Sequence, residues 1–204
     1  MSLLSNTRRL NRLLQQAAGK PVSFREMAEV LRDTMQANIY VISRKGKLLG
    51  IANIDPILGG ELDRVVNRDN RFSEEWNGLF LKIDETESDY GNETEVFDAE
   101  GKLREMFGGQ YMTVIPIVGG GERLGTLVLT RAEAPFEDSD LILAEYGATV
   151  IGMEILREHA EEKELAARQK AIVQVAVASL SFSELEAVEH IFEELDGMEG
   201  LLGA

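Results

Sequence analysis

The sequence contains no cysteine and only two histidines among its 204 residues. Without cysteine there are no disulfides, thiolate nucleophiles or cysteine-ligated metals. His159 and His190 each lack a second histidine three or four residues away, so we expect no metal site. No spacing of Asp and Glu suggests paired catalytic acids, and no serine lies in a nucleophile motif, so we expect no enzyme activity.

Long apolar runs are also missing. None approaches the ~20 residues that cross a bilayer. The arginine-containing start has neither the apolar stretch nor the cleavage site of a signal peptide. We therefore predict a cytoplasmic protein. With 44% hydrophobic residues, the chain has enough apolar side chains for one core and an appendage.

Negative charge dominates, with a net charge of −15, and it is unevenly distributed. Residues 1–60 hold nine Lys and Arg against four Asp and Glu, whereas the remaining residues hold twelve against thirty-two. An acidic surface repels phosphate. We therefore expect this chain by itself to bind DNA poorly.

The first 60 residues predict two helices and a β-hairpin. Apolar residues recur at helical spacing over residues 3–18. Ser23 and Glu26 form a capping box that opens a second helix, which ends near Met35. Two strands, joined by a turn at Lys45-Gly46, are predicted over residues 38–43 and 47–52.

Residues 53–110 are polar and rich in turn-forming residues. Such an irregular segment inside a compact domain is typical of a binding loop. Within it, short helices are predicted near residues 61–66 and 73–80. Two further strands, around a five-residue turn, are predicted over residues 112–118 and 124–130. The glycines between these strands indicate a hairpin turn, because a phosphate-binding glycine loop leads from a strand into a helix.

The last third of the chain is predominantly helical. A helix begins at Asp138 and continues to about Leu180, and ~40 helical residues span about 60 Å. The run SFSELEAVEHIFEELDG, residues 181–197, predicts a short amphipathic helix opened by a capping box of Ser183 and Glu186. Its apolar face needs a partner. The partner is either the preceding chain or the rest of a domain of which this helix is the first piece.

Two clusters of side chains suggest ligand binding. Arg44, Lys45 and Lys47 place three cations in a turn of an otherwise acidic chain, which suits a polyphosphate or makes a solvated turn. Aromatic rings in the irregular segment either line an apolar pocket suited to a branched-chain amino acid or pack in the core. These rings belong to Phe72, Trp76, Phe80 and Phe97.

Four stretches of sequence resemble the CodY family of nutrient-responsive transcriptional repressors, residues 1–33, 119–131, 140–158 and 181–197. The resemblance implies an α+β fold that begins with a GAF domain. In such a domain an antiparallel sheet carries helices on one side and a small-molecule cavity on the other. The implied domains are a GAF ligand-sensing domain at 1–136, a long linker helix at 137–180 whose first half packs on the GAF domain, and the start of a truncated winged helix-turn-helix domain at 181–204.

The resemblance also implies two effectors and no cofactor. Isoleucine or valine would bind in the GAF pocket, with Arg64, or alternatively Arg68, holding the carboxylate. The residues implied for the amino acid are Arg64, Phe72, Trp76, Phe97, Tyr40 and Val96. Those implied for GTP are Ser43, Arg44, Lys45, Lys47, Glu154 and His159. The chain departs from the usual family residues, two prolines and a lysine, at Ser73, Asp98 and His159.

We therefore expect the effector-sensing part of a homodimeric transcriptional repressor. DNA would be contacted only through a missing C-terminal domain, and no membrane would be involved. Two alternatives remain. One is a structural dimerisation module whose pocket is filled by its own side chains, and the other is a GAF-fold enzyme that processes nucleotides.

Overall fold

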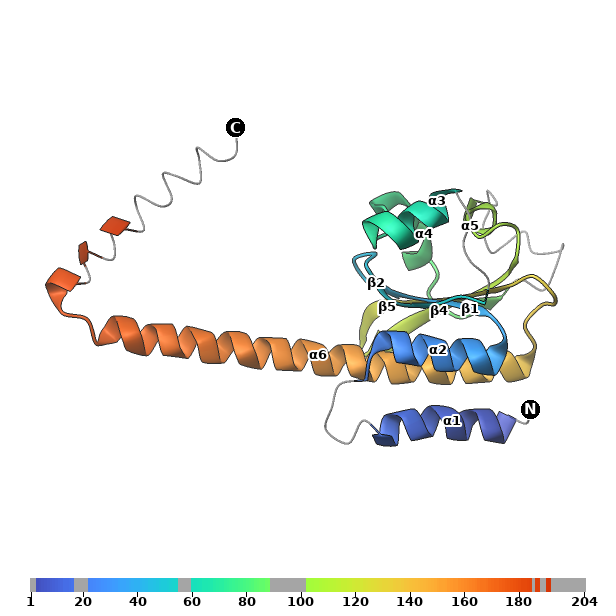
Figure 1. The fold of residues 1–204 in the computed structure, drawn as a ribbon, viewed down its shortest axis with the longest axis horizontal. Coiled ribbons are helices and arrows are strands. Elements are labelled where there is room, and N and C mark those ends of the chain that lie inside the picture. The colour runs from blue at the N-terminus through green and yellow to red at the C-terminus, as the bar shows by residue number, and fades with distance from the viewer. Residues whose placement is uncertain are drawn as a thin grey trace. The chain divides into compact units, whose positions relative to one another are not determined.

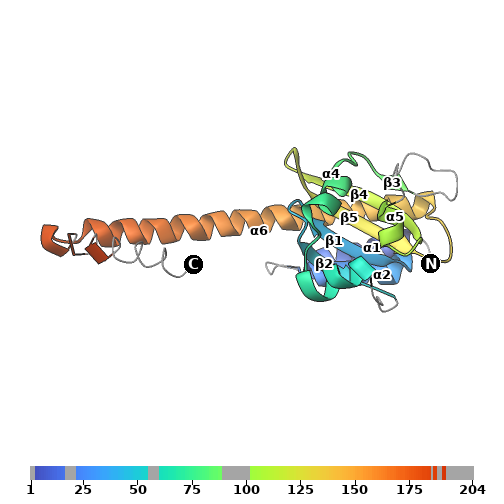
Figure 2. The same cartoon turned by 90° about the horizontal axis from the view of Figure 1, so that it is seen from above.

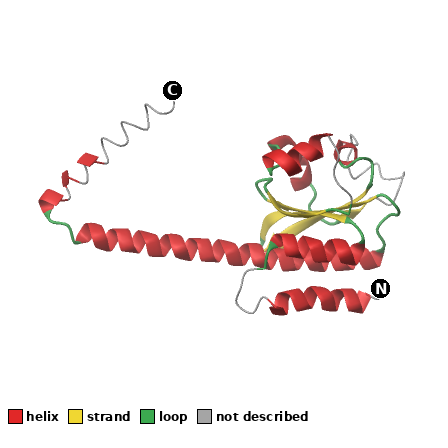
Figure 3. Ribbon diagram, in the orientation of Figure 1, coloured by secondary structure: helices red, strands yellow, loops and turns green. Residues whose placement is uncertain are grey.

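A computed structural model describes most of the chain, and it contains two compact units, residues 1–158 and 159–204. The described residues are 3–16, 22–54, 60–88, 102–184, 186–187 and 190–191. Figure 3 shows that the first unit is a sheet with helices on both of its faces. Among the described helices, none is both long and apolar enough to cross a membrane.

The sheet has five antiparallel strands in the order β2-β1-β5-β4-β3. Their bounds are β1 Asn38–Ser43, β2 Leu48–Ala52, β3 Glu87–Ser88, β4 Tyr111–Gly119 and β5 Glu122–Arg131. Both predicted hairpins are confirmed. The predicted five-residue turn was too long, because β4 extends to Gly119 and β5 begins at Glu122. Only Gly120 and Gly121 form the turn, and their φ angles of +61° and +80° suit a tight hairpin turn. The short strand β3 was not predicted.

The first face of the sheet is covered by α2, Phe24–Met35, and by the beginning of α6, Asp138–Ala178 (Figures 1 and 2). The predicted capping box of α2 is confirmed, since Ser23 Oγ accepts from Arg25 N at 3.2 Å and the Glu26 carboxylate accepts from Ser23 N at 3.4 Å. Between these helices and the sheet lies an apolar core that includes Leu31, Ile39, Leu127, Leu129 and Ile151.

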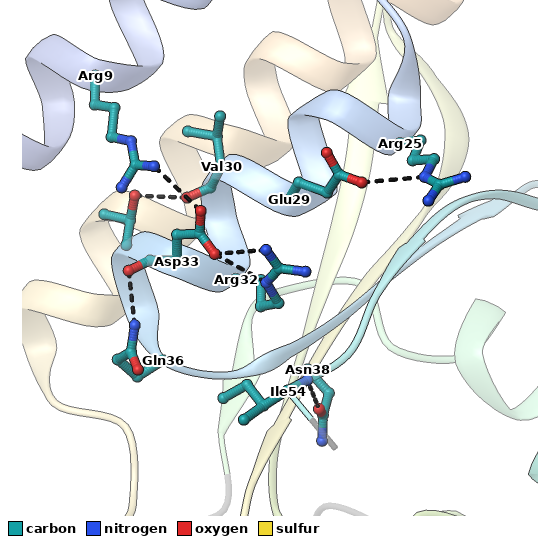
Figure 4. A network of polar contacts seen from close by, with 10 residues as sticks. Arg9, Arg25, Glu29, Val30, Arg32, Asp33, Gln36, Asn38 and Ile54 are labelled. Atoms are coloured by element: carbon teal, nitrogen blue, oxygen red, sulfur yellow. Dashed lines mark hydrogen bonds and ion pairs between the residues drawn. The ribbon is translucent and has the colours of Figure 1, made fainter. Parts of the chain in front are cut away.

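Helix α1, Leu3–Gln16, lies on the far side of α2 and α6 from the sheet (Figure 1). Arg9 pairs with Asp33 of α2 at 3.1 Å, and Tyr146 of α6 donates a hydrogen bond to Asn11. Figure 4 shows that Arg9 and Arg32 converge on the carboxylate of Asp33. Polar contacts therefore contribute to holding this helix on the domain.

The second face of the sheet is covered by short helical elements, α3 Gly60–Arg64, η1 Val65–Asp69, α4 Glu74–Leu81 and α5 Lys102–Met106. They enclose a second apolar core that includes Tyr40, Phe72, Phe80, Phe107 and Val128. The short helices predicted near residues 61–66 and 73–80 are confirmed as α3 and α4, and they lie on the face where the GAF resemblance implied a small-molecule cavity. The apolar strands β1, β4 and β5 are buried on both faces, so each face needs a covering layer.

Arg123 of β5 fastens this second layer to the sheet. Its guanidinium donates to the carbonyl oxygens of Ile83 at 2.6 Å and Phe80 at 3.3 Å, just beyond and within the C-terminal end of α4. It also donates to Gly125 O at 2.6 Å and to Thr126 Oγ1 at 2.9 Å within its own strand. Burial lowers the pKa of Arg123, and the nearby Asp84 opposes this shift.

Helix α6 ends at Ala178, close to the predicted end at Leu180. The predicted cap of the following helix was wrong. The Glu184 carboxylate accepts from Ser181 N at 2.8 Å and from Ser181 Oγ at 2.6 Å, and residues 182–184 are already helical. The cap therefore lies two residues earlier than the Ser183 and Glu186 pair.

Close packing of α2 on β2 gives a first test, for which Gly50 is the sensitive position. A Cβ atom at Gly50 would lie 2.4 Å from the carbonyl oxygen of Phe24, so Gly50→Ala should lower the free energy of unfolding by about 1–3 kcal/mol. Gly78→Ala in α4 is the matched control. Among the described residues, no atom outside its immediate neighbours and its own helix backbone lies within 4 Å of its Cβ position, so Gly78→Ala should stabilise by about 0.5–1 kcal/mol. Urea unfolding measures both, and a neutral Gly50→Ala would contradict the packing.

The Arg123 contacts give a second test. Arg123→Lys keeps the charge but cannot reproduce the forked set of hydrogen bonds, so we expect a loss of about 2–3 kcal/mol in the free energy of unfolding. Arg168→Lys, at an exposed ion pair with Glu164, should cost less than about 0.5 kcal/mol. Equal effects of the two substitutions would show that Arg123 does not hold the second layer.

Candidate functional site

The tip of the β1–β2 hairpin holds the predicted cations. Ser43 Oγ accepts from Lys47 N at 3.0 Å, and Gly46 donates to Ser43 O at 2.9 Å with a φ of +81°. The Ser43 hydroxyl is therefore already engaged in forming the turn. The side chains of Arg44, Lys45 and Lys47 are exposed. The structure thus brings three cations together at one surface, as the sequence predicted.

Residues 70–77 pack against this tip, which the sequence did not predict. Leu48 donates to Asn70 O at 3.0 Å, and Phe72 donates to Gly46 O at 2.9 Å. Arg71 Nη1 donates to Lys45 O at 3.1 Å, and Asn77 Nδ2 donates to Arg44 O at 3.0 Å. No local pattern signals these contacts, because they join residues that are 26 and 33 positions apart.

A cleft of about 500 Å³ lies between the tip and the N-terminus of α4. Its lining consists of Lys45, Arg71, Phe72, Ser73, Glu74 and Asn77. Two cations and the positive end of a helix favour an anion here, although Glu74 opposes it. Asn77 is 8% exposed, and its Oδ1 atom has no hydrogen-bond partner in the described structure. The cleft therefore also offers an acceptor for a ligand or water that carries a hydrogen-bond donor.

Tyr40 and Phe72, predicted to line the amino-acid pocket, are both 1% exposed. Edge-to-face contacts join Tyr40 to Phe107 at 5.1 Å, Phe107 to Phe80 at 6.4 Å, and Phe80 to Phe72 at 5.3 Å between ring centroids. We call these four rings the aromatic cluster. Trp76 is partly buried and packs against the same core. Phe107 was not predicted to belong to this pocket, and its only signal was that it is a further aromatic residue within the irregular segment 53–110.

The hydroxyl of Tyr40 stays protonated at neutral pH. Burial raises its pKa, and a hydrogen bond with Thr130 lowers it by a smaller amount. Tyr40 therefore contributes a neutral polar group to a largely apolar cluster. Phe97 and Val96, also predicted for this pocket, lie outside the described residues.

Arg64, predicted to hold a ligand carboxylate, has a side chain that is 63% exposed and pairs with Asp69 at 3.2 Å. The alternative, Arg68, is also exposed. Arg64 immediately precedes the π-helical turn η1, and Asn70 after it has a φ of +49°. Arg64 would have to exchange Asp69 for the ligand in order to bind a carboxylate.

Glu154, predicted to face a nucleotide base, is 6% exposed. Its carboxylate pairs with Arg157 at 3.0 Å and accepts from Val22 N at 3.2 Å. It therefore pins the chain before α2 to helix α6. His159 is exposed and begins the second unit.

Comparisons with known proteins identify the family. The family model described as the CodY GAF-like domain matches residues 2–179. The chain is 55% identical over 206 aligned positions to the global transcriptional regulator CodY of Bacillus licheniformis, covering 100% of this chain and 78% of that protein. The identity and coverage are the same for the CodY of Lysinibacillus sphaericus.

Solved structures agree on the fold. The cofactor-binding GAF domain of the nutrient sensor CodY from Clostridium difficile is similar with a TM-score of 0.50 and 38% identity, over 76% of this chain and 99% of that domain. A GAF domain from a phosphoenolpyruvate-protein phosphotransferase of Coxiella burnetii has a TM-score of 0.50 at 15% identity, over 80% of this chain and 99% of that one. The latter supports the fold alone.

The GAF fold expected from the sequence is therefore confirmed. The relatives are named as regulators of transcription, so the prediction that this chain is not an enzyme is also confirmed. The chain belongs to the CodY family of global transcriptional regulators.

Proposed function

We propose that this chain is the effector-sensing part of a transcriptional repressor that responds to branched-chain amino acids and to GTP. The observation that carries the proposal is the 38% identity of this chain to a domain described as the cofactor-binding GAF domain of a nutrient sensor. The cationic tip and the aromatic cluster supply surfaces of suitable chemistry for these two kinds of effector.

The second face of the sheet is the proposed site for isoleucine or valine. The aromatic cluster offers apolar side chains to pack against a branched side chain, with Tyr40 at one end of the cluster and Phe72 at the other. Arg64, two residues from buried Leu62, would supply the cation for the carboxylate after leaving Asp69. The cost of this exchange is small, because an exposed ion pair contributes only about 0–1 kcal/mol.

The hairpin tip is the proposed site for the phosphates of GTP. Arg44, Lys45 and Lys47 are exposed and close in sequence, and main-chain hydrogen bonds fix the turn that carries them. A fixed turn reduces the entropy lost when a polyphosphate binds. Glu154 would accept from the guanine base, and His159 would replace a lysine usual in the family.

The chain after the sensing domain would carry the signal to DNA. Helix α6 would act as a linker over residues 137–180, and residues 181–204 would begin a winged-helix DNA-binding domain. The sensing domain would comprise residues 1–136. The regulator would be a cytoplasmic homodimer, and DNA would be contacted through the winged-helix domain rather than through this acidic chain.

Titration with isoleucine tests the amino-acid site. We expect saturable binding of isoleucine and valine by calorimetry, and weaker binding of glycine, because glycine has no side chain to bury. Arg64→Ala should weaken isoleucine binding about 10- to 100-fold, the range expected for a charge-assisted hydrogen bond of about 1.5–3 kcal/mol.

Arg25→Ala is the control for this titration. Like Arg64→Ala, it removes one exposed arginine side chain, but from α2 on the first face of the sheet. It should leave the dissociation constant of isoleucine unchanged. If none of the amino acids binds, the aromatic cluster is a self-filled core, and the chain is better described as a structural module.

Titration with GTP at two salt concentrations tests the cationic tip. Lys47→Gln removes one proposed phosphate contact, so it should weaken GTP binding and reduce the dependence of affinity on salt. Lys82→Gln makes the same change in charge at the C-terminus of α4, whereas the cleft lies at its N-terminus, and should have little effect on GTP binding. Equal effects of the two substitutions would mean that GTP responds to overall charge and that the tip is not its site.

A further inference from the structure

The same short segment contacts both proposed effector sites. Through Asn70, Arg71, Phe72 and Asn77, residues 70–77 exchange hydrogen bonds with main-chain atoms of Arg44, Lys45, Gly46 and Leu48. We call residues 70–77 the connecting segment. The atoms that it contacts belong to the main chain carrying the three cations, so a displacement of this segment changes where the cations point.

Phe72 joins the connecting segment to the aromatic cluster. Its main-chain N–H donates to Gly46 O at 2.9 Å, whereas its side chain lies 5.3 Å from the ring centroid of Phe80. One residue therefore has its backbone on the hairpin tip and its ring in the proposed amino-acid site. A ligand that moves this ring also shifts the hydrogen bond to Gly46.

Close packing makes the tip and the segment move together. A Cβ atom at Gly46 would lie 3.0 Å from Phe72 O and 3.3 Å from both Cβ and Cγ of Asn77. Asn77 is almost fully buried, and its amide donates to Arg44 O at 3.0 Å. Leaving the buried amide of Asn77 without its acceptor is costly, so this contact resists separation of the two elements.

The backbone is unusual where the connecting segment begins. The π-helical turn η1 precedes it, and Asn70 has a left-handed φ of +49°. A π turn holds an extra residue relative to an α-helix and is frequent where a helix changes shape in function. A change in this turn would move residues 70–77 without breaking the sheet.

We infer that the connecting segment couples the two effectors, and that Asn77 is a positioning residue for the cationic tip. The inference rests on the proposed function and adds its regulation. Binding of the amino acid fixes Phe72, and through Asn77 and Arg71 it fixes the tip in its phosphate-binding form. GTP then binds more tightly, and by linkage it strengthens binding of the amino acid by the same factor.

The test is a thermodynamic cycle measured by calorimetry on the chain as it stands. The dissociation constant of GTP is measured without and with saturating isoleucine, and the constant of isoleucine without and with saturating GTP. We expect each ligand to tighten the other about fivefold or more, with equal factors in both directions. Asn77→Ala should reduce this factor to about one, and the same cycle reports its separate effect on the affinity of each ligand alone, because Asn77 also lines the cleft.

Asn67→Ala is the control, because Asn67 donates to Asp63 on the exposed side of η1 and should keep the full factor. Arg71→Ala is a second variant, in case Asn77→Ala does not fold. The Arg71 side chain is exposed, so its removal should leave the domain folded. Arg71→Gln keeps a donor for Lys45 O without the charge and should restore coupling.

The possible outcomes distinguish a failure of coupling from a failure of ligand binding. If both ligands bind the unaltered chain but the factor is one, or if Asn77→Ala and Arg71→Ala keep the full factor, the inference is overturned and the proposed function stands. If neither ligand binds the unaltered chain, the proposed function fails and the inference with it.

Discussion

Burial of the central strands on both faces is the constraint on which the rest of this structure depends. In β1, Ile39 and Val41 belong to the core beneath α2 and α6, whereas Tyr40 and Ile42 belong to the opposite core. Because successive side chains of a strand point to opposite faces, an apolar strand requires two covering layers. The chain provides α2 and α6 for one face and the short helical elements of residues 60–106 for the other.

The two layers are attached in different ways, and this difference shapes the proposed site. Helices α2 and α6 are long and pack directly on the sheet, and Gly50 permits close contact with Phe24. The second layer is built from short elements that also depend on polar tethers from Arg123 and Asn77. Short elements with few tethers rearrange more easily than long packed helices. The proposed amino-acid site would therefore lie beneath the layer of the domain that rearranges more easily.

Local patterns predicted much of the fold. The capping box at Ser23, both hairpins and the extent of α6 follow from neighbouring residues, and the resemblance to CodY identified the GAF fold. The predicted cap at Ser183 failed because Ser181 and Glu184 carry the same spacing two residues earlier, and sequence spacing does not choose between overlapping capping boxes. On the second face, the short helices predicted near residues 61–66 and 73–80 correspond to α3 and α4. Helix α5 was not predicted, because five residues are too few for a clear helical period.

The sequence alone determined which side chains are available. They include three cations in one predicted turn and several aromatic residues in the irregular segment, and there is no cysteine. It also determined the elements whose signals are local, because helix caps and alternation act over a few residues. Only the tertiary structure decided that Asn77 binds Arg44 O, that Arg123 reaches Ile83 O, and that Phe107 completes the aromatic cluster. Such contacts join residues that are far apart in the sequence and meet only when the whole domain packs. No local sequence pattern specifies which of these residues meet.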